Sequence, residues 1–273
     1  MLPVNQFGAN YTDFCTLSHN KAMLLLLLVA VTSLVHSAPV INVSLPLDCE
    51  DVYILIKSSD ENATIPDGVY TIYPAGPDHP VKVFCDMGCK EDDNHQDGRW
   101  TVIQRRIDGN VSFYQPWKDY KNGFGDASGE YWLGLENMFL MTNTEKYQLR
   151  VDMEDFERGS AYALYTTFFI GSESNSYTLN IGGYINGGAG DSLFYVNGRP
   201  FSTFDKDPTG YCADTNGGGF WYNYYYWYYY SYYNYYNYGY CHIANPNGLY
   251  KLNNVNAVST GSFGKPGKVA TTL

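Results

Sequence analysis

The chain has 273 residues and a formal net charge of -11. This balance excludes nucleic acid as the main partner, because phosphate binding needs a basic surface, and it is compatible with divalent cations. The length allows one large domain or two small ones. Tyr occurs 28 times and Gly 27 times, a composition that favours strands, turns and loops over long helices.

Residues 1–37 are predicted to be a leader that ends in a signal peptide. An apolar run begins at Met23, and small residues near its end predict cleavage after Ser37. The run is short for a membrane span, so we expect secretion; a signal anchor is the alternative. Translation from Met23 itself is a further hypothesis, since the residues before it do not resemble a signal-peptide start. Residues 38–46 form a short N-terminal segment.

Export would place the cysteines in an oxidising compartment, where they pair if geometry allows. Cys15 would leave with the leader, so an odd number remains: Cys49, Cys85, Cys89, Cys212 and Cys241. Cys85 and Cys89 lie close together in the sequence but lack an accompanying histidine pair, which argues against zinc. Sequons for N-linked glycosylation begin at Asn42, Asn62 and Asn110.

In chain order, short apolar runs alternate with Gly, Pro, Asn and Asp from Cys49 onward. Period-two patterns predict strands over residues 68–74, 81–85, 100–106, 147–156 and 161–170. Short helices are predicted over residues 117–124 and 134–142. Asp108, Gly109 and Asn110 form a hairpin turn signal. After Asp191 the chain becomes loop-like, and loops on a rigid scaffold usually carry binding residues. The fold class is α+β with a mainly antiparallel sheet.

Several segments together resemble the fibrinogen-like family, which contains the fibrinogen C-terminal domain. These segments are residues 45–53, 67–74, 83–87, 98–106, 123–125, 129–136, 147–156, 189–193 and 201–207. The resemblance covers about residues 45–222 and 241–250, and its order and spacing are specific. It implies one globular domain over residues 47–250, with short helices, a central sheet and a loop-rich C-terminal subdomain.

The resemblance also implies two disulfides and a calcium loop. The disulfides would join Cys49 to Cys85 and Cys212 to Cys241, leaving Cys89 to link two chains or to remain a buried or capped thiol. Each bond is worth roughly 2–4 kcal/mol. A Ca²⁺ ion would be held by the carboxylates of Asp205 and Asp207 and by the carbonyls of Thr209 and Tyr211. This loop is shorter than the family usually has, and Pro208 directly follows the second carboxylate.

A ligand pocket like that of the acetyl-binding lectins of the family is expected from His242, Tyr222 and a cis peptide bond between Tyr240 and Cys241. The alternative for His242 is a loop histidine that bonds to the backbone. Asn216 stands where such lectins often have a pocket tyrosine, a departure from the family pattern.

A Tyr-rich insertion at about residues 224–239 has three interpretations. It is a strand pair with aromatic faces and an aggregation-prone edge, a surface for carbohydrate or matrix, or low-complexity sequence inserted in a binding loop. Residues 251–273 are expected to be a disordered tail that lacks the family's closing strand. An edge of the central sheet would then stay open.

The resulting functional prediction is a secreted, calcium-dependent binding glycoprotein of the extracellular matrix, associated with microfibrils, elastin or collagen. The first alternative is lectin-like recognition of acetylated glycans in innate immunity. The second is a degraded paralogue, or one whose coding sequence is in error. We expect homo-oligomers, no membrane span after signal cleavage, and no enzyme activity. The run from Gly187 to Ser192 lacks the lysine of a phosphate loop.

Overall fold

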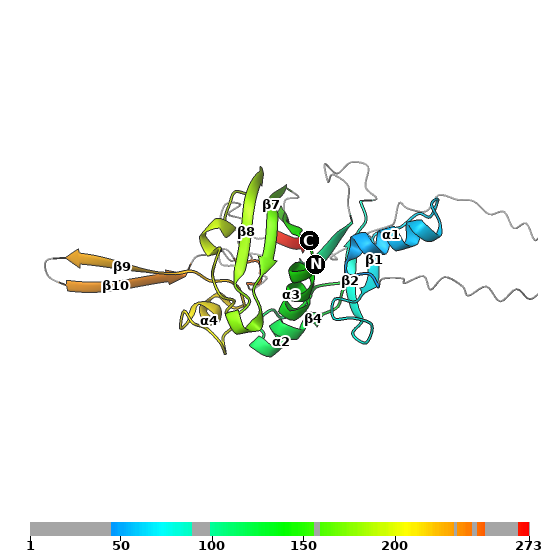
Figure 1. The fold of residues 1–273 in the computed structure, drawn as a ribbon. Helices are drawn as coiled ribbons and strands as arrows, with labels where there is room; N and C mark the ends of the chain where they lie inside the picture. The colour runs from blue at the N-terminus through cyan, green and yellow to red at the C-terminus, as the bar shows by residue number, and fades with distance from the viewer. Residues whose placement is uncertain are drawn as a thin grey trace, which may run out of the picture.

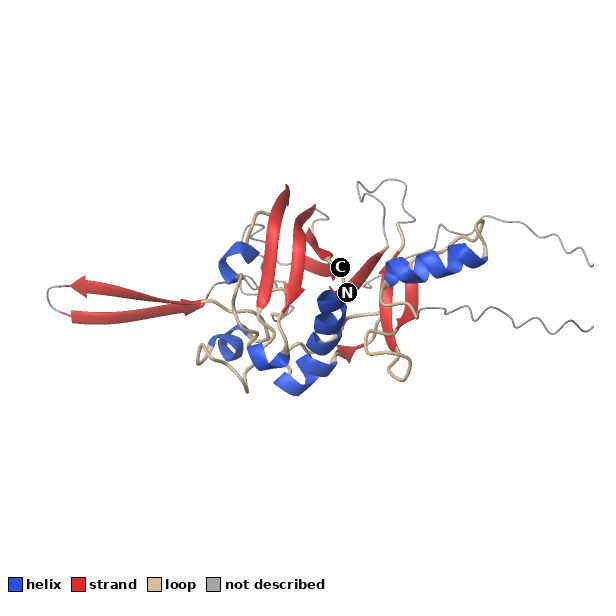
Figure 2. Ribbon diagram, viewed as in Figure 1, coloured by secondary structure: helices blue, strands red, loops and turns tan. Residues whose placement is uncertain are grey.

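A computed structural model describes residues 45–88, 99–155, 159–231, 234–241, 245–248 and 267–272. In the described residues, a central antiparallel sheet is flanked by short helices (Figures 1 and 2). The strands are β1 (Gly68–Ile72), β2 (Val81–Asp86), β3 (Trp100–Arg106), β4 (Phe124–Gly125), β5 (Tyr131–Trp132), β6 (Tyr147–Asp155), β7 (Ser160–Ile170), β8 (Leu179–Gly187), β9 (Tyr224–Ser231), β10 (Asn234–Cys241) and β11 (Gly267–Thr272). The helices are α1 (Cys49–Ser59), α2 (Trp117–Asn122), α3 (Leu135–Thr144) and α4 (Cys212–Asn216), with 3-10 turns η1 (Glu173–Asn175) and η2 (Leu193–Val196).

The central sheet has the order β1-β2-β3-β11-β6-β7-β8, with β5 joining β4 to β3. The five predicted strands coincide with β1, β2, β3, β6 and β7, and the two predicted helices coincide with α2 and α3. The α+β fold class is confirmed. Helix α1 and strand β8 were not predicted. In the part of the chain that the structure describes, no helix has the length and apolar character needed to cross a bilayer.

Strand β11 overturns the expectation of a missing closing strand. It pairs antiparallel with β3 on one side, where Val269 lies opposite Arg106, and with β6 on the other, where Val269 lies opposite Met153. Residues 267–272 are therefore a central strand, and the prediction of a disordered tail is wrong for them. The physical reason is that β3 and β6 would otherwise each present a row of unpaired backbone groups. Residues 251–266 lie outside the described part.

Helix α1 begins where Asp48 accepts a hydrogen bond from the backbone N–H of Asp51 at 2.9 Å, a typical N-cap. The other carboxylate oxygen of Asp48 accepts the hydroxyl of Tyr147 at 2.7 Å. The first residue of the helix, Cys49, is disulfide-bonded to Cys85 in β2. Helix α1 is thereby fixed beside β1 and β2, at the end of the domain opposite to β9 and β10 (Figure 1).

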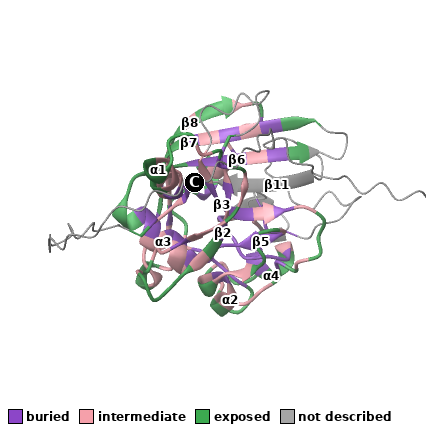
Figure 3. Cartoon of the chain, turned by 90° about the vertical axis from the view of Figure 1, so that its right-hand side faces the viewer, coloured by how far each residue is buried: buried purple, intermediate pink, exposed green. Residues whose placement is uncertain are grey.

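The core lies where the strands face the helices. Along β7 buried residues alternate with more exposed ones (Figure 3), and the phase changes after Tyr165, where the pairing with β6 is irregular. Next to this layer, an aromatic cluster of Tyr120, Trp132, Phe201 and Trp221 is almost fully buried. The ring centroids of Phe201 and Trp221 are 4.9 Å apart in an edge-to-face arrangement, which is a favourable geometry for aromatic pairs.

The predicted hairpin turn at Asp108 is wrong. Strand β3 is followed by a loop and then by α2, and its sheet neighbours are β2, β5 and β11. The turn is organised around the buried carboxylate of Glu130, which accepts the backbone N–H groups of Ile107, Asp108, Gly109 and Val111 at 2.7–3.2 Å. A side chain distant in sequence therefore satisfies the backbone that a partner strand would have satisfied.

The Tyr-rich insertion forms the strand pair that was one of its three interpretations. Strands β9 and β10 pair antiparallel from Tyr224 opposite Cys241 to Ser231 opposite Asn234. Figure 1 shows this hairpin projecting from the body of the domain, away from the central sheet. It forms a separate two-stranded sheet.

Candidate functional site

The candidate site lies in the loops that follow β8. A disulfide joins Cys212, the first residue of α4, to Cys241, the last residue of β10. The base of the hairpin is thus bound covalently to the loop that holds the predicted calcium residues. The ring of Tyr211 also contacts that of Tyr224, with centroids 5.2 Å apart.

Asp207 is the organising residue of this loop. One carboxylate oxygen accepts the backbone N–H of Thr209 at 2.8 Å and the hydroxyl of the same residue at 2.5 Å. The other oxygen accepts the backbone N–H of Ala213 at 2.8 Å, in the first turn of α4. Charge-assisted bonds of this kind are strong. The carboxylate therefore fixes the turn and the start of α4 by itself.

Asp205 connects the loop to a different helix. Its carboxylate accepts the backbone N–H of Trp117, the first residue of α2, at 2.8 Å. It also accepts the hydroxyl of Thr203 at 2.7 Å. Between the two acids, the ammonium of Lys206 lies 3.5 Å from the centre of the Trp117 ring, a cation–π contact. Asp205 is exposed and Asp207 is half-buried.

A calcium shell needs about six to eight oxygen ligands. In this conformation both oxygens of the Asp207 carboxylate already accept hydrogen bonds, so this carboxylate stabilises the loop without an ion. The carbonyl of Tyr211 accepts the N–H of Thr215 at 3.0 Å within α4.

Chelation tests this interpretation. We expect that exchanging millimolar calcium for EDTA shifts the melting temperature by no more than about 1 °C. Asp207→Ala should lower stability by about 2–4 kcal/mol in both conditions, because it removes three charge-assisted hydrogen bonds. Asp78→Ala, at an exposed loop position, is the control. A calcium-dependent rise in melting temperature that vanishes in Asp207→Ala would show that this carboxylate does bind the ion.

Two features predicted for an acetyl pocket differ in the described part of the chain. Tyr222 is buried, with 1% of its surface exposed, and its hydroxyl donates to the carbonyl of Gly218 at 2.7 Å. It is a core residue rather than the wall of an open pocket. The predicted cis peptide before Cys241 is also wrong, because the described residues contain none and Tyr240 and Cys241 continue the β9–β10 pairing. His242 lies outside the described residues.

Asn216, the residue that departs from the lectin pattern, is the last residue of α4, and its side-chain amide donates to the carbonyl of Cys212 at 2.8 Å. Of the sequon residues, Asn62 and Asn110 are exposed, so glycosylation there remains a prediction. Asn42 and Cys89 lie outside the described residues.

A buried polar network that sequence reasoning missed holds the late loops against the sheet. The amide of Gln104 in β3 donates to the Asn247 side chain at 3.0 Å, and Asn247 donates to the carbonyl of Gly219 at 2.9 Å. The guanidinium of Arg106 donates to the carbonyl of Gly248 at 2.9 Å. The signal in the sequence was that Gln104 and Arg106, two positions apart in a predicted strand, lie on the same face of it.

Glycine is required where this network meets the loop. A Cβ atom on Gly218 would lie 2.2 Å from the carbonyl oxygen of Asn247. A Cβ atom on Gly219 would lie 2.6 Å from the ring of Tyr120. Neither backbone carbonyl nor packed ring can move away easily, so the sequence Gly218–Gly219 allows residues 245–248 to pack closely.

Exposed aromatic side chains gather around α4. The rings of Tyr114 and Phe204 are stacked with centroids 4.7 Å apart, and the hydroxyl of Tyr114 donates to Asp214 of α4 at 2.5 Å. Tyr211, at the start of α4, is exposed as well. We call Tyr114, Phe204 and Tyr211 the aromatic surface.

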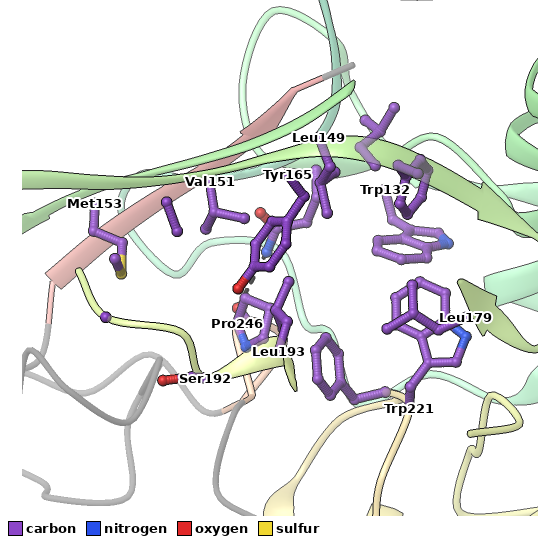
Figure 4. A pocket seen from close by; sticks show the side chains of 16 residues that line it. Trp132, Leu149, Val151, Met153, Tyr165, Leu179, Ser192, Leu193, Trp221 and Pro246 are labelled. Atoms are coloured by element: carbon purple, nitrogen blue, oxygen red, sulfur yellow. Dashed lines mark hydrogen bonds between the residues drawn. The ribbon is translucent and has the colours of Figure 1, made fainter. Parts of the chain in front are cut away.

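An apolar pocket lies behind this region, between the central sheet and the late loops (Figure 4). The space inside it that water molecules can occupy is about 40 Å³. Leu149 and Val151 of β6 line it from the sheet side, and Leu193 and Pro246 line it from the loop side. The hydroxyl of Tyr165 donates to Asp191 at 2.8 Å. Of the predicted calcium and ligand residues whose side chains the structure describes, none lines this pocket.

Comparisons with known proteins agree with the fold. The family model described as fibrinogen beta and gamma chains, C-terminal globular domain, matches residues 45–265. Microfibril-associated glycoprotein 4 of Homo sapiens is 47% identical over 213 residues, covering 75% of this chain and 72% of that protein. Angiopoietin-related protein 1 of Bos taurus is 42% identical over 159 residues, 57% of this chain and 31% of that protein.

Among solved structures, the fibrinogen-like globe domain of human ANGPTL2 is similar, with a TM-score of 0.65 and 34% identity. The match covers 83% of this chain and 97% of that one.

Proposed function

Because the chain belongs to the family of the fibrinogen C-terminal globular domain, we propose that it is a secreted, oligomeric glycoprotein that binds extracellular matrix components through its aromatic surface. The resemblance to microfibril-associated glycoprotein 4 supports this. The chain would act by binding and not by catalysis. Its partner would be elastin, collagen or another microfibril component.

The observation that carries the proposal is the exposure of the aromatic surface. Tyr114 is 40%, Phe204 41% and Tyr211 38% exposed, although large aromatic side chains gain most free energy when buried. They are held in place by α4 and by the disulfide at its first residue. Rigid aromatic side chains on a fixed scaffold are typical centres of protein interfaces.

The titratable groups of the described core support a binding role. Burial raises the pKa of Tyr120 and of Tyr222 well above the usual range, so both remain hydroxyl donors. The hydroxyl of Tyr120 donates to the carbonyl of Phe113 at 2.7 Å and accepts the N–H of Gly219 at 2.9 Å. The shifts are accounted for by burial in the core, and they do not require an active site.

Lectin-like recognition of acetylated glycans has less support. Tyr222 is buried, and the backbone at Tyr240 and Cys241 continues a regular strand pairing. An acetyl pocket would need an exposed Tyr222 and a different backbone conformation between Tyr240 and Cys241. Acetylated ligands therefore serve as the competing arm of the test.

Binding to immobilised elastin and fibrillar collagen, measured by surface plasmon resonance, tests the proposal. We expect the double variant Phe204→Ser, Tyr211→Ser to bind at least about 10-fold more weakly, because the loss of two interface aromatics costs about 1.4 kcal/mol or more. The control is Phe169→Ser with Ile185→Ser, which alters exposed apolar residues on β7 and β8. Unchanged matrix binding in the double variant, or binding only to acetylated albumin, would contradict the proposal.

A further inference from the structure

The β9–β10 hairpin is an uncharged ribbon on an acidic protein. From Thr215 to Tyr250 the sequence contains no Asp, Glu, Lys or Arg, although the whole chain carries a net charge of -11. The hairpin also projects beyond the body of the domain (Figure 1). Two copies of the chain repel one another through their acidic bodies, and they can approach with least repulsion at this ribbon.

Neither outer edge of the ribbon pairs with another strand in the described part of the chain. Among the described strands, β9 and β10 pair only with each other. Natural edge strands are protected by short length, lysine, proline or bulges. Each strand here has eight residues, without proline or lysine, and the register between them is regular. The devices that normally prevent edge-to-edge pairing are therefore missing.

The edge of β9 is the stronger candidate of the two. Residues 224–230 are an uninterrupted run of aromatic residues, six tyrosines and Trp227, and aromatic residues favour strands. Strand β10 contains Gly239 and two asparagines, which weaken strand pairing.

We propose that two copies of the chain associate through the edges of their β9 strands, which pair antiparallel about a two-fold axis into a four-stranded intermolecular sheet. Such an interface uses the same patch on both copies and closes at a dimer.

The disulfide between Cys212 and Cys241 makes this association specific, because it fixes the base of the ribbon to the body. Dimerisation through β9 is an interaction separate from matrix binding, and it does not depend on matrix binding. The aromatic surface that we assign to the matrix lies around α4, whereas this edge lies along the ribbon.

Sedimentation equilibrium of the secreted full chain, from about 1 to 100 µM, tests the proposal. We expect the average mass to rise from monomer to dimer over this range. The variant Tyr226→Lys, Tyr228→Lys places like charges in the paired edge, at a cost of several kcal/mol, and should raise the dimer dissociation constant at least about 100-fold. Phe169→Lys with Ile185→Lys adds the same charge at exposed positions of β7 and β8 and should dimerise like the native chain.

The lysine variant is also checked for folding, by its melting temperature and by mass mapping of the Cys212–Cys241 disulfide. It should keep both, and it should bind elastin or collagen as the native chain does. A native chain that stays monomeric over the whole range would overturn the proposal, and so would dimerisation that the hairpin lysines leave unchanged.

Discussion

Deleting residues 267–273 will lower the stability of the domain more than any single side-chain substitution described above. Strand β11 lies between β3 and β6 and pairs with both. Without it, these strands would lie about two strand spacings apart, roughly 9.5 Å, and could not pair directly. Each backbone hydrogen bond contributes about 0.5–1.5 kcal/mol, against a total stability of about 5–15 kcal/mol for a domain.

The measurement is thermal unfolding of the secreted protein, followed by circular dichroism. We expect the truncated chain to lose its cooperative transition or to fail to leave the cell. Deleting Leu273 alone is the control, because β11 ends at Thr272. A second variant, Ala270→Pro, removes one backbone donor within the strand and should be destabilising as well. A truncated chain that melts at the native temperature would show that β11 is not required.

The second large effect is expected for Glu130→Gln, which should lower the free energy of unfolding by about 3–5 kcal/mol. Glu130 is 4% exposed, accepts four backbone N–H groups and lies 3.6 Å from the guanidinium of Arg106. The glutamine replaces an acceptor oxygen with a donor that faces other donors, and it leaves the buried charge of Arg106 without its counterion. The expected drop in melting temperature is about 6–20 °C. Glu145→Gln, at an exposed position, is the control.

The same carboxylate predicts a pH dependence. Burial acts to raise the pKa of Glu130, but the N–H donors of Val111, Ile107 and Gly109, together with Arg106, outweigh it, so the pKa is lowered. A lowered pKa in the folded state contributes stability above the ordinary value of about 4.5, and this stability is lost as the pH falls further. Native protein should therefore lose stability below about pH 4.5 more steeply than Glu130→Gln. Parallel curves would contradict this role.

The sequence was sufficient to predict a strand where its local pattern of apolar and polar residues agreed with the burial that the fold imposes. Strand β7 shows the period-two alternation that reflects one buried face, whereas β3 is buried at five of its seven positions. Strand β8 escaped detection because Gly182, Gly183 and Gly187 interrupt its pattern. Strand β11 escaped because only six residues form it and because its stability comes from two neighbours far away in the sequence. Such a strand has no strong local signal.

The candidate site was harder to predict than the fold. Both disulfides implied by the family resemblance are present in the structure, since cysteine pairing follows from the fold itself. The prediction that Tyr222 lines a pocket was wrong for a physical reason. The sequence shows that residue 222 is aromatic, but it does not show that its hydroxyl turns inward to Gly218. The roles of Gln104 and Asn247 depend on contacts across 143 positions of the chain, which local patterns do not contain.

The position of β11 has a consequence for how the protein is made. The middle of the sheet is filled by a segment that leaves the ribosome long after both of its neighbours, β3 and β6. The facing edges of these two strands stay unpaired during synthesis of the more than one hundred residues that separate β6 from β11. Folding by such distant contacts is slow and exposes open edges on the way. Completion of this domain is therefore a late event in its biosynthesis, and chaperones have a long interval in which to act.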